Sequence, residues 1–208
     1  MKNILAIVGV IVLAVAGFVG WQYMKIQKAL TGPAKEIVSE SIERTGETWH
    51  ASFVSKLDGT PDEVFQAFST PERLSEIMPE SFMQSKLVSS DGDKKVVDFV
   101  AKIEILPPGF KVQNPRIEFT YFPNEKRITS KTIDFQLADI TSEYKFEPAD
   151  GGKSTIGRLE QQNKPKTASI VESLQKGAIR ESYITQVRAA TKGLAQEKAK
   201  GAGAPKAG

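Results

Sequence analysis

The sequence predicts an α+β fold in which a curled antiparallel sheet of about seven strands surrounds one long C-terminal helix. Three patterns lead to this expectation. Two short helices are signalled after a first strand, apolar and polar residues then alternate from 82 to 164, and helical spacing begins at 169. Because tight turns join most consecutive strands, the sheet should be antiparallel.

The first strand is expected over 48–59, and it is followed by a motif in which Thr-Pro occurs twice. Thr60 is a natural N-cap before a proline at the first helical position, and Glu63 completes a capping box. The second Thr-Pro predicts that Thr70 caps another short helix, which Pro79 ends. The chain should therefore form two separately capped helices with a sharp corner between them.

Alternating residues predict the rest of the sheet. The segment 82–105 reads as two strands joined by a turn at Asp91-Gly92. The remaining strands are expected at 116–122, 126–137, 140–148 and 153–164. Because it is rich in proline, the segment 106–115 is expected to be a loop.

The C-terminal segment 169–200 places apolar residues at helical spacing and predicts one long amphipathic helix. Ser169 and Glu172 have the spacing of a capping box at its start. An antiparallel sheet has one face to bury, and this helix is the only expected element long enough to cover it. The sheet should curl around the helix, with the two short helices at the open end.

The N-terminus contains an apolar stretch, Ile4–Met24, that no charged residue interrupts. As a helix it would span roughly 30 Å, which is the thickness of the hydrocarbon core of a bilayer. Residues 1–24 are therefore expected to be a transmembrane anchor. A cleaved signal peptide is the alternative, because Ala14-Val15-Ala16 resembles a cleavage site. A short tail with one lysine favours a domain on the periplasmic or extracytoplasmic side of a single-pass membrane protein.

The rest of the chain divides by composition. Residues 25–47 are polar and are interpreted as a linker, 48–197 as the folded domain, and 198–208 as a disordered tail. The chain has no cysteine and one histidine, so disulfides, thiol chemistry and Cys/His metal sites are excluded. The net charge of +3 is mild and no basic face carries interleaved aromatics, so neither nucleic acid nor a cofactor is predicted.

The stretch GTPDEVFQAFSTPERLSEIMPE begins with a small-Pro-x-x-hydrophobic-Phe-x-x-Phe pattern and continues with a proline-started helix. With the order of elements, it resembles the START-like, or Bet v 1-like, superfamily, also called SRPBCC and including polyketide cyclase/dehydrase-type proteins. The resemblance covers about residues 48–195 and implies a helix-grip fold. Many bacterial members similarly carry an N-terminal apolar helix. One departure is that Ile77-Met78 stands before Pro79 where many members have Trp.

The resemblance implies a hydrophobic cavity between the sheet and the C-terminal helix that holds a lipid, quinone, sterol or polyketide-like molecule. Inward-facing apolar residues are candidates to line it. They are Phe65, Phe68, Phe99, Ile103, Phe119, Tyr121, Tyr144, Phe146 and Leu174. The alternative is that the same residues form a close-packed core with no room for a ligand.

These observations favour a membrane-tethered binding or carrier domain for a lipophilic small molecule. A cyclase- or dehydratase-type enzyme using the same cavity is the first alternative, and a protein-interaction module is the second. An enzyme needs an acid or base in the cavity, but His50 should point away from its inward neighbour Trp49. The sequence thus favours a binding function over an enzymatic one without deciding between them.

The other ionisable pairs are expected to lie on solvated faces. They are Arg158 with Glu160, Asp98 with Lys102, and Arg180 with Glu181. No catalytic residue is assigned from them, and no nucleophile–base–orienter set can be drawn.

Overall fold

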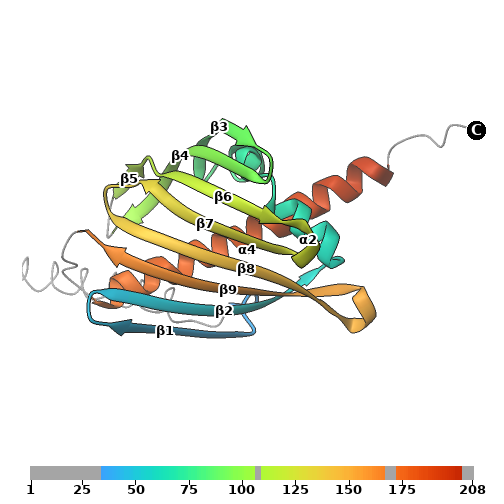
Figure 1. Cartoon of the computed structure of the whole chain (residues 1–208), viewed down its shortest axis with the longest axis horizontal. Helices are drawn as coiled ribbons and strands as arrows, with labels where there is room; N and C mark the ends of the chain where they lie inside the picture. The colour runs from blue at the N-terminus through green and yellow to red at the C-terminus, as the bar shows by residue number, and fades with distance from the viewer. Residues whose placement is uncertain (1–33, 106–108, 167–171, 203–208) are drawn as a thin grey trace, which may run out of the picture. The chain divides into compact units, whose positions relative to one another are not determined.

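A nine-stranded antiparallel sheet and one long helix form most of the described chain (Figure 1). The structure is a computed structural model, and it describes residues 34–105, 109–166 and 172–202. Eight strands follow one another in the order β1-β2-β9-β8-β7-β6-β4-β3, and β5 pairs only with β4. The predicted α+β class and curled antiparallel sheet are confirmed, and the predicted strand count was too low.

The strands are β1 (Ser39–Thr45), β2 (Thr48–Asp58), β3 (Phe82–Asp91), β4 (Lys94–Ile105), β5 (Gly109–Gln113), β6 (Arg116–Phe122), β7 (Arg127–Asp134), β8 (Ala138–Ala149) and β9 (Ser154–Pro165). The helices are α2 (Pro61–Phe68), a 3₁₀ turn (Pro71–Arg73), α3 (Leu74–Ile77) and α4 (Glu172–Ala202). The predicted capping box at Ser169 lies outside the described residues.

Two strands were missed in the sequence. Residues 39–45, expected to belong to a linker, form β1, which pairs with β2 from Ser39 opposite Val54 to Thr45 opposite Thr48. Only Ile42 of this strand is buried, so its sequence lacks the alternation that marked the others. Residues 109–113, expected to be a loop, form β5 against the end of β4.

The first Thr-Pro begins α2 as predicted. The Glu63 amide donates to the Thr60 hydroxyl at 3.3 Å, and the Thr60 amide donates to the Glu63 carboxylate at 2.8 Å. Thr70 stands at the N-cap with Pro71 after it, as predicted, but its side chain does not cap the helix, because its hydroxyl donates to the Ala67 carbonyl oxygen at 3.3 Å. The second helix is accordingly a 3₁₀ turn followed by the four residues of α3.

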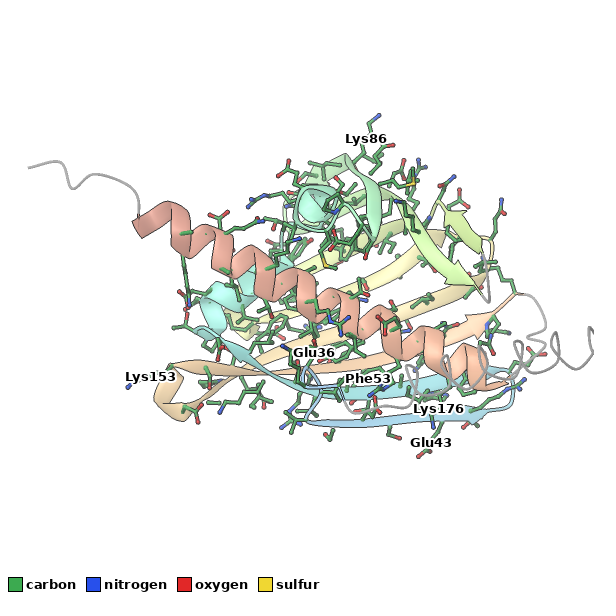
Figure 2. The ribbon with its side chains drawn as sticks, turned by 180° about the vertical axis from the view of Figure 1, so that it is seen from behind. Glu36, Glu43, Phe53, Lys86, Lys153 and Lys176 are labelled. Carbon is green, nitrogen blue, oxygen red and sulfur yellow. The ribbon has the colours of Figure 1, made fainter. Side chains whose placement is uncertain are left out.

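Helix α4 lies across the inner face of the sheet, as the two opposite views show (Figure 1, Figure 2). Its buried residues recur at helical spacing, and the Tyr183 ring stacks on Phe53 of β2 at 4.5 Å. The inner core row consists of residues that lie opposite one another on five neighbouring strands. It runs Tyr121, Ile128, Tyr144, Leu159 and Phe53. The curled sheet therefore places its apolar face against the helix.

Strand β1 and the residues just before it also contact α4 through ion pairs. The Arg180 guanidinium, 6 % exposed, donates to both carboxylate oxygens of Glu40 at 3.0 and 2.8 Å. Arg188 pairs with Glu36 at 2.9 Å. The expectation of an exposed Arg180–Glu181 pair was wrong, because β1 covers the side of the helix that carries Arg180.

The structure tests only some of the expectations for the two ends of the chain. The expected anchor, 1–24, lies outside the described residues, and no helix within the described ranges has the length and hydropathy to cross a bilayer. Residues 198–202, expected to be disordered tail, continue α4 to Ala202. Residues 203–208 lie outside the described chain.

Candidate functional site

The aromatic residues expected to line a cavity do converge on the inner face of the sheet. Phe65 and Phe68 come from α2, Phe99 from β4, Phe119 and Tyr121 from β6, and Tyr144 and Phe146 from β8. Ile103 lies on β4 and Leu174 on α4, and the side chains of both lie outside the described residues. The structure thus brings seven of the nine candidates to one layer.

These rings form a continuous series of contacts. Phe119 contacts both Phe99 and Tyr121 at centroid distances of 6.4 Å, and Tyr121 meets Phe65 edge-on at 6.4 Å. Phe68 lies 4.9 Å from Phe146 and 5.6 Å from Tyr144. Offset and edge-on pairs of this kind form an apolar wall with polar tips on its tyrosines. We call this group the aromatic wall.

Two of the inner tyrosines have partners for their hydroxyls. Tyr144 donates to the Oε1 of Gln186 on α4, and Tyr183 shares a 2.7 Å hydrogen bond with Ser55 of β2. Burial raises the pKa of Tyr144 and of Tyr183 above the ordinary value. Both phenols therefore stay neutral at physiological pH and fasten α4 to the sheet.

Tyr121 differs from them. Its side chain is 7 % exposed, yet its Oη has no hydrogen-bond partner among the described residues. Burial raises the pKa of Tyr121, and the charge of Glu72 raises it further. The hydroxyl is therefore a neutral donor at physiological pH, enclosed in the aromatic wall without an acceptor from the described chain.

Glu72 and Lys95 both interact with Tyr121, the first through its charge and the second over the ring. The Lys95 ammonium donates to the Glu72 Oε1 at 2.8 Å and to the Ser69 carbonyl oxygen at 2.9 Å, and lies 5.8 Å from the centre of the Tyr121 ring. The other carboxylate oxygen, Oε2 of Glu72, is buried with no partner in the described part of the chain. The 3₁₀ turn thus carries a buried acceptor whose charge acts on the Tyr121 phenol of β6.

This polar group was missed in the sequence. Lys95 has the same parity in β4 as the buried residues Val97 and Phe99, so alternation alone would have placed it on the inner face. Glu72 follows Pro71 directly, where an acid is typical of the first turn of a helix, so local pattern gives it no inward role. A third atom without a partner among the described residues, Nε2 of Gln113, lies on β5 opposite Ala101.

The acid–base candidates lie elsewhere. His50 is exposed, as predicted from its alternation with Trp49. Arg158 pairs with Glu147 at 3.1 Å on the exposed face, and Arg116 donates to both oxygens of Asp98 at 2.6 and 2.8 Å. That hydrogen-bonded arginine lowers the pKa of Asp98. None of these side chains reaches the aromatic wall.

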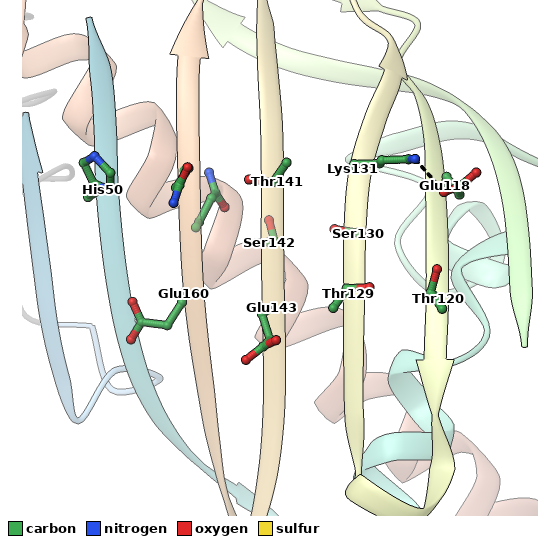
Figure 3. A pocket seen from close by; sticks show the side chains of 12 residues that line it. His50, Glu118, Thr120, Thr129, Ser130, Lys131, Thr141, Ser142, Glu143 and Glu160 are labelled. Atoms are coloured by element: carbon green, nitrogen blue, oxygen red, sulfur yellow. Dashed lines mark ion pairs between the residues drawn. The ribbon is translucent and has the colours of Figure 1, made fainter. Parts of the chain in front are cut away.

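A hollow of about 570 Å³ lies on the opposite, outer face of the sheet (Figure 3). Its walls are His50, Glu118, Thr120, Thr129, Ser130, Lys131, Thr141, Ser142, Glu143, Glu160, Gln161 and Gln162. Lys131 and Glu118 pair across it at 2.9 Å. Because its walls are polar, this hollow does not suit an apolar ligand.

Comparison with solved structures decides the fold. The chain is similar to the ZhuI aromatase/cyclase from Streptomyces sp. R1128, with a TM-score of 0.60 and 12% identity over 75% of this chain and 98% of that one. It is similar to a START superfamily protein from Mycobacterium smegmatis, with a TM-score of 0.57 and 12% identity over 71% and 98% of the two chains. The chain has the START/Bet v 1-like helix-grip fold.

A third helix-grip structure, Ara h 8.0201, has a TM-score of 0.56 and 15% identity, covering 71% of this chain and 99% of that one. No protein-family model matches the sequence, and no curated protein does either. At these identities the likeness establishes the fold alone. The function of this helix-grip domain has to be argued from its own residues.

Proposed function

We propose that this chain is a membrane-tethered binding or carrier domain for a lipophilic small molecule, held between the sheet and α4. The observation that carries the proposal is the buried Tyr121 hydroxyl without a partner inside the aromatic wall. An unpartnered buried polar group costs about 1–3 kcal/mol, and nearly all such groups in proteins have partners. A ligand that accepts this hydrogen bond would recover that cost.

The form of the wall supports an apolar ligand. Ligand pockets are mostly apolar and aromatic, with a few polar groups that orient the molecule. Phe68 of α2 and Phe119 of β6 are only partly buried, so the wall is exposed at these two rings. A neighbouring fold, norcoclaurine synthase from Thalictrum flavum, was solved in complex with dopamine and hydroxybenzaldehyde. We therefore propose small lipophilic or aromatic molecules as ligands.

The membrane part of the proposal rests on the sequence. The uncharged stretch Ile4–Met24 is long enough to cross a bilayer, and we propose that it anchors the domain there. The short N-terminal tail favours a domain on the periplasmic or extracytoplasmic side. A tether would keep a carrier of lipophilic molecules beside the membrane that holds them. Carbonate extraction and protease accessibility in intact cells test the anchor and the side.

Native mass spectrometry of the full chain tests the binding function. The chain is extracted in mild detergent, transferred to an amphipathic polymer and measured with its co-purified molecules. We expect the wild type to carry one lipophilic molecule per chain. Phe119→Trp should carry clearly less of it, because the larger ring occupies the space beside the aromatic wall. Val88→Trp, at an exposed apolar position of β3, is the matched control and should retain the molecule. A chain that carries no lipophilic molecule and binds no added one contradicts the proposal.

A further inference from the structure

We propose that the ligand carries a hydroxyl group, as an alcohol or a phenol, at its buried end, and that Tyr121 and Glu72 bind this group together. The proposal rests on the proposed function and narrows its ligand class. It follows from two buried atoms without partners, the Tyr121 hydroxyl and the Glu72 Oε2, and from the partly exposed Lys95 that holds Glu72.

The positions of these groups are fixed by the fold. Tyr121 projects from β6 into the core row, and its backbone amide donates to the Asp93 carbonyl oxygen at 2.8 Å, where β4 begins. Lys95 binds Ser69 and one oxygen of Glu72, which leaves the second oxygen free to accept. Lys95 is thus already engaged with Ser69 and with Oε1 of Glu72, and this contact holds the carboxylate in place.

The two unpartnered atoms have opposite hydrogen-bonding roles. The Tyr121 hydroxyl donates, and a carboxylate oxygen such as Glu72 Oε2 only accepts. A ligand hydroxyl supplies one acceptor and one donor on a single atom. It can therefore accept from Tyr121 and donate to Glu72, so that both buried atoms gain partners at once.

Other polar groups fit less well. A ketone, quinone or ester carbonyl accepts from Tyr121 but leaves the Glu72 oxygen without a donor. A carboxylate would bring a second negative charge against Glu72 in a water-poor site. An ammonium would meet the positive charge of Lys95, which lies 2.8 Å from the other oxygen of Glu72. Tyr121, Glu72 and Lys95 therefore select among ligands by the hydrogen-bonding role and by the charge of the ligand's polar group.

Three matched probes test this: 2-naphthol, 2-methoxynaphthalene and 2-naphthoate, at neutral pH, where the naphthol is uncharged. Dissociation constants are measured by calorimetry with the full chain in the amphipathic polymer, after subtraction of polymer alone. We expect 2-naphthol to bind about tenfold more tightly than its methyl ether, which cannot donate, and 2-naphthoate to bind most weakly. Tyr121→Phe should weaken 2-naphthol and its ether alike, by about fivefold, because both oxygens accept from the Tyr121 hydroxyl.

Two further variants separate hydrogen bonding from folding. Glu72→Gln removes the negative charge and should tighten 2-naphthoate binding by about tenfold while weakening 2-naphthol. Tyr183→Phe removes a buried hydroxyl that is already paired with Ser55, so the ratio between naphthol and ether should not change. Thermal unfolding followed by circular dichroism confirms that each variant is folded.

The outcomes distinguish the two proposals. Equal binding of naphthol and ether by the wild type overturns the hydroxyl proposal and leaves the binding function standing. The same holds if Tyr121→Phe leaves 2-naphthol binding unchanged or if Glu72→Gln leaves 2-naphthoate unaffected. If none of the three probes binds and no lipophilic molecule co-purifies, both proposals fail.

Discussion

The inner face of the sheet has two halves that are built differently. Under α4, on β2, β8 and β9, buried polar side chains have partners: Tyr183 pairs with Ser55, Tyr144 with Gln186, and the Trp49 indole donates to Gln175 at 2.8 Å. On β4 and β6, beside α2 and the 3₁₀ turn, Tyr121 and Glu72 each keep a buried atom without a partner in the described chain.

The two regions therefore have different roles: the one with paired polar groups stabilises the fold, and the one with unpaired groups is suited to binding. Paired polar groups in a packed core fix the position of α4 and favour one native arrangement. Unpaired groups reduce stability unless something binds to them. We call the two regions the helix half and the open half. The predictions below compare equivalent residues in the two halves, beginning with the largest effect.

Removal of a core ring should have the largest effect in the helix half. Phe53 is fully buried and stacks on Tyr183, so Phe53→Ala should lower the free energy of unfolding by about 3–5 kcal/mol. Phe119→Ala, in the partly buried open half, should cost less than about half as much. Thermal and urea unfolding of the full chain measure both. Equal losses would mean that the open half is as closely packed as the helix half.

The ion pairs of α4 offer a second comparison. Arg180→Met leaves Glu40 without its buried guanidinium and should lower the free energy of unfolding by about 2 kcal/mol. Arg188→Met removes a half-exposed arginine and should cost about 0.5 kcal/mol or less. Urea unfolding distinguishes the two values. A small effect at Arg180 would show that β1 contributes little to the position of α4.

The two tyrosine hydroxyls give the most specific comparison. Tyr183→Phe leaves the Ser55 hydroxyl buried and unpaired, which should cost about 1–2 kcal/mol. Tyr121→Phe removes a buried hydroxyl that has no partner, so without ligand the free energy of unfolding should rise by about 1 kcal/mol or more. The measurement is the unfolding free energy after removal of bound molecules. A loss at Tyr121 equal to that at Tyr183 would contradict the unpaired state.

Alkaline pH should destabilise both halves, and the difference between them should be smaller than in the comparisons above. Burial raises the folded-state pKa of Tyr121, Tyr144 and Tyr183 above the ordinary value of 10.0. Their contribution to stability is therefore complete below pH 10.0 and is lost as pH rises toward the folded-state pKa values. Tyrosinate absorbance should increase only with unfolding. Ionisation of these phenols near pH 10.0 in a natively folded chain would contradict their burial.

Much of the fold could be predicted from the sequence because local signals agreed with it. The capping box at Thr60, the alternation of the middle strands and the helical spacing after 169 each depend on neighbouring residues. Strand β1 could not be recognised in this way. It is an edge strand with one buried residue, Ile42, and its pairing partner supplies the information that its own sequence lacks.

The candidate site was predicted only in its apolar part. Alternation and helix faces were enough to collect the aromatic wall, whose residues are far apart in the sequence. The contact between Lys95 and Glu72 joins β4 to the 3₁₀ turn, and no local pattern reports such a pairing. The capping hydrogen bond expected from Thr70 is absent for a related reason. Its hydroxyl donates to the Ala67 carbonyl oxygen and does not accept from an amide of the following turn.

Binding of 2-naphthol to three forms of the full chain tests the central claim most directly. The forms are the wild type, Phe119→Trp in the aromatic wall and Thr129→Trp in the outer hollow. We predict that Phe119→Trp weakens binding by about tenfold or more, because the added ring occupies the ligand's space, while Thr129→Trp leaves the dissociation constant unchanged. Loss of binding in Thr129→Trp together with wild-type affinity in Phe119→Trp would contradict a ligand site between the sheet and α4.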